Sequence, residues 1–223
     1  MKIDYVMKLG GSLLYDLEKT KSLMSRIEKS SNKNVVYTVG SGYLGEVYKK
    51  WVREENGISV PYENSIKIWS DLQSTNANII ASLNHNFVVC DNEEDIQVAL
   101  NNSQRPIIDA RGFHDEFKGL KYQTTDVRSA CLCNKLNCKN LIIVTDVNGI
   151  YSGDPKKDSN SQRIEVINAR ELINMGRTSV DKGLAEMLIQ YGITGYVVGV
   201  DSLVQSKDLS QKETFEQGTI IEY

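Results

Sequence analysis

The sequence predicts an α/β fold, a three-layer sandwich in which a largely parallel central sheet is covered by helices on both faces. The first observation is a set of short apolar runs typical of buried strands, at residues 5–9, 35–39, 87–90, 106–108, 141–145 and 195–198. The second is that these runs alternate with stretches of helical character, which favours parallel pairing. The third is the length of 223 residues, which with three prolines and no Gly/Ser-rich linker fits a single domain, 1–223.

The longest predicted helix covers residues 65–83, and further helices are predicted at about 126–136 and 180–191. The apolar stripe of the long helix recurs at helical spacing and consists of Ile66, Trp69, Leu72, Asn76, Ile79, Ile80 and Leu83. Because this stripe is wide for a helix that covers a sheet, we expect it to pair subunits in a homo-oligomer.

Composition excludes several classes of partner. There are 26 basic and 29 acidic residues, so the net charge of -3 provides no general attraction for nucleic acid or an anionic membrane. No apolar run approaches the roughly 20 residues of a membrane span, and the first strand and glycine loop occupy the place of a signal peptide. We therefore expect a cytoplasmic protein. The four cysteines lack paired C-x-x-C spacing, so we expect reduced packing residues and no metal ligands.

Two predicted strands each lead into a glycine loop. The first gives Lys8-Leu9-Gly10-Gly11-Ser12, and the second gives Val39-Gly40-Ser41-Gly42. Glycine lets backbone N–H groups approach an anion closely, and a lysine adds positive charge, so a strand followed by such a loop is a phosphate site in outline. Lys8 alone could be an exposed residue before a turn, but the second loop at the same end of the sheet favours phosphate binding.

Two other phosphate signatures fit less well. No G-x-x-x-x-G-K-[ST] sequence occurs, so a Walker P-loop is absent. The segment 40–45 contains G-x-G-x-x-G after a strand, which is a weak dinucleotide signal, and a dinucleotide fold would leave the first glycine loop without a purpose.

A second long motif, Thr145-Asp146-Val147-Asn148-Gly149-Ile150-Tyr151-Ser152-Gly153-Asp154-Pro155, follows the predicted strand 141–145. Together with Lys-x-Gly-Gly-Ser it resembles the amino acid kinase family, which includes uridylate, acetylglutamate and isopentenyl phosphate kinases. Residues 216–221 also resemble the closing strand of that family, so the resemblance covers nearly the full length. It implies an amino-acid-kinase-like fold with an acceptor lobe at about 1–122 and a nucleotide lobe at about 123–223. It also implies ATP with Mg²⁺, held chiefly by the nucleotide phosphates.

The resemblance implies roles for the two glycine loops. The ammonium of Lys8 would reach the transferring phosphoryl group, while backbone N–H groups of the loops hold phosphate oxygens. The phosphate-binding residues would be Gly10, Gly11, Ser12, Gly40, Ser41 and Gly42. The family usually has three glycines in the second loop, so Ser41 fits if its φ is negative and is strained if its φ must be positive.

The resemblance also places the adenosine in the second half. The nucleotide-binding residues would be Thr145, Asp146, Val147, Gly149, Tyr151, Asp154, Pro155 and Lys157. An ordinary hairpin ended by Pro155 would explain the glycine and the proline but not the whole motif.

The segment Tyr122-Gln123-Thr124-Thr125-Asp126 resembles the aromatic-aromatic-Thr-Thr-Asp of uridylate kinases. There, the threonines meet the acceptor and the aspartate orients the catalytic lysines, so Asp126 is the expected organising carboxylate. The alternative is that Thr125 or Asp126 caps the helix 126–136. A second catalytic lysine is expected at Lys182, at the start of the helix 180–191, where a solvated surface lysine is the competing interpretation.

The acceptor side differs from uridylate kinases. Glu46 stands where the archaeal enzymes have an arginine that binds the acceptor phosphate, and this substitution reverses the local charge. A carboxylate there would suit an amine-bearing acceptor, as in the aminomethylfuran phosphate kinases of the same family, unless it is an exposed helical glutamate. Arg111 is a candidate ligand for the acceptor phosphate, and His114, in the same predicted loop, is a candidate for proton transfer.

These features predict an ATP-dependent kinase that transfers the γ-phosphoryl group to a small acceptor, a phosphate monoester. A carboxylate acceptor such as an amino acid, and a non-catalytic nucleotide-binding or storage protein on the same fold, remain the alternatives.

Overall fold

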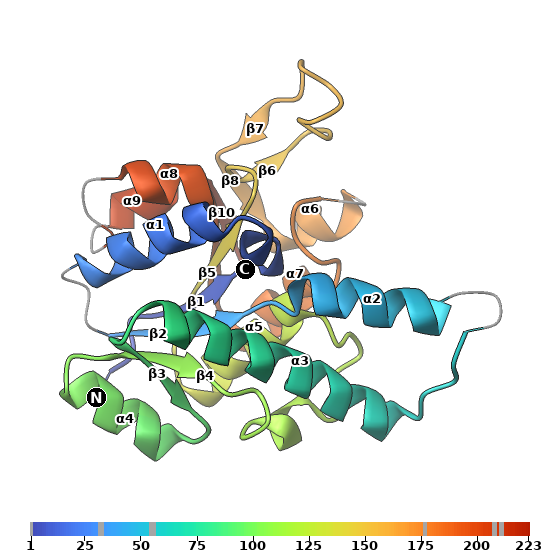
Figure 1. Cartoon of the computed structure of the whole chain (residues 1–223). Helices are drawn as coiled ribbons and strands as arrows, with labels where there is room; N and C mark the ends of the chain where they lie inside the picture. The colour runs from blue at the N-terminus through green and yellow to red at the C-terminus, as the bar shows by residue number, and fades with distance from the viewer. Residues whose placement is uncertain (1, 31–33, 54–56, 176–177, 207–208, 210–211) are drawn as a thin grey trace.

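The structure is a computed structural model that describes residues 2–30, 34–53, 57–175, 178–206, 209 and 212–223. Within these residues one eight-stranded sheet crosses the molecule in the order β3-β4-β2-β1-β5-β9-β10-β8 (Figure 1). Its strands are β1 (Tyr5–Leu9), β2 (Val35–Val39), β3 (Phe87–Cys90), β4 (Arg105–Ile108), β5 (Asn140–Thr145), β8 (Val166–Asn168), β9 (Thr194–Gly199) and β10 (Thr219–Glu222). All neighbouring pairs are parallel except β9 and β10, which are antiparallel.

Helices cover both faces of this sheet. One core cluster joins it to α4 (Glu93–Asn101), α5 (Thr125–Lys135), α6 (Ala169–Asn174) and α7 (Leu184–Tyr191). A second cluster joins the other face to α1 (Leu17–Glu28), the later part of α3 (Tyr62–Leu83), α8 (Val200–Gln205) and α9 (Lys212–Glu216). The helix α2 (Gly42–Arg53) packs on α3 and on the short helix η1 (Gly11–Tyr15). The expected three-layer α/β sandwich is confirmed.

Most predicted elements lie within a few residues of their observed bounds, but two differ in ways that affect the site. The helix predicted at 180–191 begins only at Leu184, after an irregular turn, so that prediction was wrong at its start. The stripe of α3 is largely occupied within the chain, since Ile80 is 1% exposed in the core and Trp69 is half-buried against Tyr48.

The position of Lys8 follows from the alternation of side chains along β1. Val6 packs into the cluster that contains α5, whereas Met7 and Leu9 pack into the opposite cluster. Because side chains on a strand alternate between faces, Lys8 shares the α5 side with Val6. This alternation directs the lysine toward the N-terminus of α5.

Three connections gather at one edge of the sheet. In the parallel register Leu9 of β1 lies beside Val39 of β2 and Val144 of β5. Parallel strands present their carboxyl ends at the same edge, so the residues after these three strands meet there, as expected for a ligand site in an open α/β sheet.

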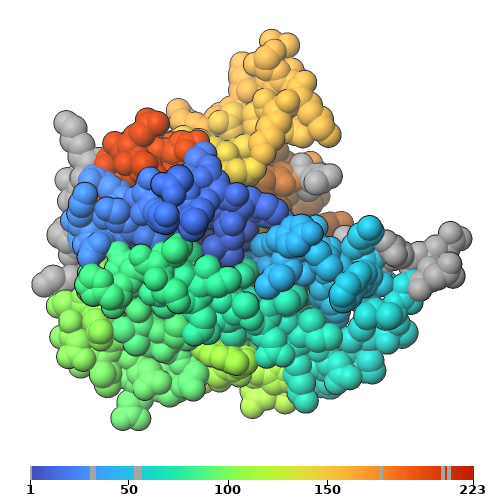
Figure 2. Space-filling model, viewed as in Figure 1, coloured from blue at the N-terminus to red at the C-terminus, as the bar shows by residue number. Residues whose placement is uncertain are grey.

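A hairpin projects from the body of the molecule above this edge (Figures 1 and 2). It consists of β6 (Ile150–Tyr151) and β7 (Arg163–Ile164), which pair antiparallel. None of the helices in the described residues is long and apolar enough to cross a membrane.

Candidate active site

The two glycine loops pack backbone against backbone. A Cβ atom on Gly11 would lie 2.3 Å from the Gly42 nitrogen, and one on Gly40 would lie 2.5 Å from the Gly11 nitrogen. The side-chain amide of Asn76 on α3 donates to the Gly40 carbonyl at 2.7 Å and holds the second loop in place. The left-handed backbone falls on Gly42, with φ of +53°, and Ser41 has no positive φ, so serine fits without strain.

Lys8 and Asp126 form a largely buried ion pair at the edge of the sheet. Lys8 Nζ lies 2.9 Å from Asp126 Oδ1, and the side chains are 13% and 4% exposed. Asp126 Oδ2 accepts the backbone N–H of Asp181 at 2.9 Å. The N-cap of α5 is Thr124, whose hydroxyl accepts from Val127 N, so the alternative that Thr125 or Asp126 caps this helix was wrong. Asp126 is therefore free of a capping role, and its carboxylate holds the lysine.

A central cavity of about 320 Å³ lies beside Lys8 and the two loops. It is lined by Lys8, Gly10, Gly11, Ser12, Tyr15, Gly40, Ser41, Gly42, Glu46, Lys49, Thr125, Thr145 and Asp181. Every residue predicted to bind phosphate thus lines one cavity, together with Thr125. Asp126 does not line the cavity, but it holds Lys8, which does.

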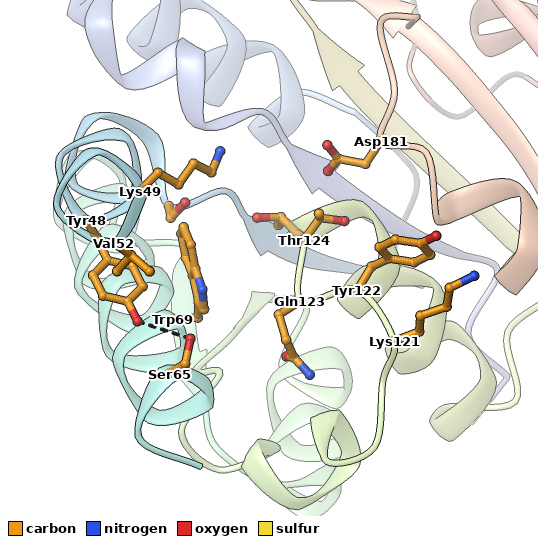
Figure 3. Close-up of a pocket in the computed structure, with 12 residues that line it drawn as sticks. Tyr48, Lys49, Val52, Ser65, Trp69, Lys121, Tyr122, Gln123, Thr124 and Asp181 are labelled. Carbon is orange, nitrogen blue, oxygen red and sulfur yellow. Dashed lines mark hydrogen bonds between the residues drawn. The ribbon is translucent and has the colours of Figure 1, made fainter. Parts of the chain in front are cut away.

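A second cavity of about 350 Å³ adjoins the first and shares Ser41, Lys49, Thr125 and Asp181 with it. Figure 3 shows Trp69 and Tyr48 on one side and Tyr122 with Lys121 on the other. The rings of Tyr48 and Trp69 meet edge to face at 5.1 Å, and the Tyr48 hydroxyl donates to Ser65 Oγ at 3.1 Å. Flat walls with polar groups between them suit a planar organic group. Thr124 lines this second cavity, as the acceptor prediction requires.

Glu46 and Lys49 lie one helical turn apart on α2. Glu46 lines the central cavity, Lys49 lines both cavities, and Lys49 Nζ contacts Glu46 Oε1 at 2.7 Å. The ammonium of Lys49 also lies 5.8 Å from the centre of the Trp69 ring. Sequence reasoning missed Lys49, although its i+3 spacing from Glu46 was a usable signal.

A third cavity of about 430 Å³ lies at the base of the hairpin. It is lined by Asp146, Val147, Tyr151, Gly153, Asp154, Pro155, Lys156, Lys157, Thr178 and Ser179. It contains most of the predicted nucleotide residues, while Thr145 lines the central cavity and Gly149 forms a turn with φ of +110°. Thr178 and Ser179 were missed because they come from the turn before α7. Burial raises the pKa of Asp146, but an ion pair with Lys156 outweighs this effect and leaves the pKa below its ordinary value.

Asp181 faces the central cavity. The pKa of its carboxyl is raised, first because surrounding protein removes water from it and second because Asp126 carries a like charge, while Lys8 opposes both effects. The residue as a whole remains exposed at the cavity wall. Sequence reasoning passed over Asp181 in favour of its neighbour Lys182.

The structure does not bring three of the candidate residues to these cavities. Lys182 is exposed, directly precedes the N-cap Gly183 of α7, and lines none of the three. Arg111 is held by a bidentate contact with Asp109, two residues earlier, and also lies outside the three linings. His114 belongs to the short helix η2 (His114–Phe117), likewise outside them. Within the described residues no cluster of three or more His, Cys, Asp or Glu side chains could hold a metal ion.

Comparisons with known proteins agree with this geometry. The model of the amino acid kinase family matches residues 5–199. The uridylate kinase of Pyrococcus abyssi is 27% identical over 237 aligned positions, covering 97% of this chain and 98% of its relative. The [5-(aminomethyl)furan-3-yl]methyl phosphate kinase of Methanocaldococcus jannaschii is 26% identical over 197 positions, covering 87% of each chain.

Among solved structures, the UMP kinase of Ureaplasma parvum superposes with a TM-score of 0.74 at 21% identity and covers all of both chains. That likeness shows a shared fold. Since the family model spans nearly the whole α/β core described above, this chain belongs to the amino acid kinase family.

Proposed function

We propose that this kinase transfers the γ-phosphoryl group of ATP to a small phosphate monoester. The observation that carries the proposal is the central cavity beside Lys8, which Asp126 holds. This cavity shares lining residues with the second cavity, and its Thr145 directly precedes Asp146 of the third. A donor nucleotide in the third cavity, at the base of the hairpin, would place its last phosphate in the central cavity. An acceptor in the second cavity, called the acceptor cavity from here on, would meet that phosphate there. Phosphoryl transfer depends mainly on such positioning and on charge stabilisation.

Each residue of the central cavity has a distinct task in this proposal. Asp126 aims the Lys8 ammonium, which stabilises charge on the transferring group. Backbone N–H groups of the two glycine loops hold the phosphate oxygens without any rearrangement during the reaction. Lys49 takes the place proposed from the sequence for Lys182, because it is the cation that borders both the central and the acceptor cavities.

Mg²⁺ fits the chemistry of the central cavity. The carboxylate of Asp181 faces it and is crowded by the like charge of Asp126, so a cation beside Asp181 would relieve that repulsion. Bound with the nucleotide, Mg²⁺ would neutralise part of the phosphate charge. Asp181 would hold it, and Asp126 would stay on Lys8.

The acceptor proposal starts from UMP. The curated relatives include uridylate kinases, and the walls formed by Trp69 and Tyr122 suit a planar base. Glu46 favours a second candidate, an amine-bearing phosphate monoester, because its carboxylate lines the central cavity. A carboxylate acceptor is not favoured, since neither relative named above is an amino acid kinase by activity. A non-catalytic role is not favoured either, since Ser41 is unstrained.

We extend the proposal to organisation and setting. The acceptor lobe, about 1–122, supplies α2 and α3, and the nucleotide lobe, about 123–223, supplies the hairpin. Thr124, Thr125 and Asp181 come from the nucleotide lobe but line the acceptor cavity, so the lobes share the site. The proposed setting is cytoplasmic, where ATP is available, without nucleic acid or membrane partners, and the proposed assembly is a homo-oligomer.

ADP release tests the proposal. The protein is incubated with ATP, Mg²⁺ and, separately, UMP, other nucleoside monophosphates, isopentenyl phosphate, [5-(aminomethyl)furan-3-yl]methyl phosphate, glutamate and aspartate. The proposal predicts ADP release that depends on a phosphate monoester. Release with an amino acid alone would move the function to a carboxylate kinase, and absence of release with every acceptor would support a binding protein.

A further inference from the structure

A buried arginine lies directly behind the acceptor cavity. Arg128, on α5, is 1% exposed and is the largest fully buried side chain in the described residues. Its guanidinium plane packs on the ring of Phe117, with 4.5 Å between Cζ and the ring centre. No part of the proposed chemistry so far uses this residue.

Among the residues that the structure describes, this guanidinium donates five hydrogen bonds, and all of them end on neutral groups. Nε and Nη2 donate to Gln123 Oε1 at 3.2 and 2.9 Å. Nη1 donates to Gln73 Oε1 at 2.8 Å and to Ser70 Oγ at 3.2 Å, and Nη2 donates to the Ile66 carbonyl at 3.2 Å. The polar atoms are satisfied, but none of these partners supplies a negative charge.

This arrangement is costly unless something else balances the charge. Buried charges in proteins are normally paired, because hydrogen bonds to neutral groups do not replace the solvation of a full charge. Burial lowers the pKa of Arg128 to about 10. The side chain therefore remains a cation at neutral pH.

The partners of Arg128 form the back of the acceptor cavity wall. Gln123 lines the cavity on one side (Figure 3) and faces Arg128 with its carbonyl oxygen. On α3, Ser65 and Trp69 face the cavity, while Ile66, Ser70 and Gln73 face Arg128. The charge is thus separated from the cavity by one layer of side chains.

The same residue fixes the geometry of that wall. With its oxygen held by Arg128, Gln123 donates through Nε2 to the Phe117 carbonyl at 2.8 Å and to the Tyr62 hydroxyl at 3.1 Å. Gln73, held in the same way, donates to the carbonyl of Val39, immediately before Gly40, at 3.3 Å. Arg128 therefore connects the acceptor wall to the second glycine loop.

We propose that Arg128 is a positioning residue that determines acceptor specificity, because its buried, unneutralised charge favours an anionic acceptor in the adjoining cavity. The proposal rests on the proposed function and deepens it. The negative charge of a bound phosphate monoester balances the guanidinium, and the corresponding uncharged alcohol gains nothing from it. At the effective dielectric of protein sites, unit charges about 10 Å apart still interact strongly enough to change affinity by about tenfold.

The test measures the dissociation constants of UMP and of uridine by calorimetry, for the protein and its variants. The wild type is expected to prefer UMP. Arg128→Met is expected to reduce that preference by about tenfold or more while uridine affinity stays within about threefold. Arg128→Lys, which retains the charge, is expected to keep the preference. The matched control is Arg105→Met, which removes a buried arginine of β4 that is 6% exposed and donates to the backbone carbonyls of Ile27 and Ser30.

Several results would overturn the proposal. If the wild type binds UMP no more tightly than uridine, the cavity has no preference for an anionic acceptor and the proposal is wrong. Equal weakening of UMP and uridine in Arg128→Met indicates a purely structural role. If that variant does not fold, the test instead follows the Nε–H NMR signal of Arg128 in ¹⁵N-arginine-labelled wild type. UMP is expected to shift this signal. An equal shift caused by uridine would contradict the proposal. Failure of the proposed function appears separately, as absence of ADP release with any phosphate monoester.

Discussion

At the scale of single residues, one ion pair lies at the boundary between the acceptor and central cavities, where Asp181 also contributes a carboxylate. Glu46 Oε1 lies 2.7 Å from Lys49 Nζ, so each side chain neutralises the other in the absence of ligand. An incoming phosphate competes with Glu46 for the lysine, whereas an ammonium on the acceptor competes with Lys49 for the glutamate. Substitution of Glu46 should therefore change kcat/KM in opposite directions for a phosphate acceptor without an amine and for an amine-bearing acceptor.

We expect Glu46→Gln to raise kcat/KM for UMP several-fold and Glu46→Arg to raise it by roughly tenfold, because both release Lys49 for the phosphate. Both variants should lower kcat/KM for [5-(aminomethyl)furan-3-yl]methyl phosphate. Steady-state kinetics with the two acceptors provides the measurement. Glu18→Gln, which breaks the similar but remote pair with Lys21 at 3.0 Å, is the control. Unchanged kinetics for both acceptors would make Glu46 a solvated helix residue.

The raised pKa of Asp181 gives a prediction about stability and pH. A carboxyl whose folded pKa is raised favours the folded state at low pH, and this contribution is lost as the pH rises through the folded pKa. At neutral pH the free energy of unfolding of the wild type is therefore lower than that of Asp181→Asn. We expect the variant to have the higher melting temperature at pH 7, and the difference to shrink as the pH falls toward about 4, the ordinary range of aspartate.

Thermal unfolding of the two proteins between pH 4 and 8 measures this difference. Asp115→Asn is the control, because a hydrogen bond and ion pair with Lys118 lower the pKa of Asp115 and the expected sign is opposite. A difference for Asp181→Asn that does not change with pH would contradict the account of the Asp126–Asp181 repulsion.

At the scale of elements, the site depends on how closely the two glycine loops approach each other. We expect Gly11→Ala to cost about 1–3 kcal/mol of stability, because its Cβ would lie 2.3 Å from the backbone of Gly42. Separating the loops should also lower kcat by roughly a hundredfold, since small displacements of positioning groups are expensive in rate. Denaturant unfolding and steady-state kinetics check both effects.

Gly195→Ala is the matched control. A Cβ atom there meets only side chains, with Leu188 Cδ1 nearest at 3.0 Å, at the end of β9 away from the site. It should lose less stability and keep its activity. If Gly11→Ala behaves in the same way, the close packing of the loops is not required.

The elements that sequence reasoning located correctly are those with strong local signals. β1, with its following glycines, and α5, with its preceding threonines, could be placed because a buried strand and a helix start each have a characteristic pattern. Their juxtaposition gave Lys8 and Asp126. The turn before α7 has no such pattern, so the helix was started too early and Lys182 was chosen in place of Asp181.

Other residues of the candidate site depend on tertiary contacts. Trp69 looked like a residue of an apolar stripe, and only the packing of α2 on α3 shows that it forms a cavity wall with Tyr48. Arg111 looked available for phosphate, but Asp109 captures it. Arg128 lies within a predicted helix, but the spacing of residues in the sequence does not show that its charge is buried beside neutral groups.

At the scale of the whole molecule, an apolar surface remains beside the site, and it includes Asn76 and Ile79 of the α3 stripe. A groove of about 220 Å³ is lined by Leu14, Leu17, Thr20, Tyr43, Leu44, Asn76 and Ile79, and several of these side chains are exposed. Exposed apolar surface of this kind is commonly covered by another subunit. This groove is therefore the better candidate for the proposed oligomer contact.

We expect the wild type to sediment as an oligomer at micromolar concentration, and Leu44→Glu with Ile79→Glu to sediment as a monomer, because charges on both sides of the groove oppose its burial. Val98→Glu, at an exposed position on α4, should leave the assembly unchanged. A wild type that is monomeric at micromolar concentration would contradict the oligomer proposal without affecting the proposed chemistry.

The central claim concerns the chemistry between the three cavities, and ³¹P NMR of the reaction mixture tests it most directly. With ATP, Mg²⁺ and an accepted phosphate monoester, the account predicts paired signals of ADP and of a new diphosphate ester in equal amounts. Lys8→Met, if folded, should slow their appearance by a hundredfold or more, about 3 kcal/mol of barrier, while Lys21→Met should not. Formation of ADP with inorganic phosphate in place of a diphosphate ester, or near-normal turnover by folded Lys8→Met, would contradict it.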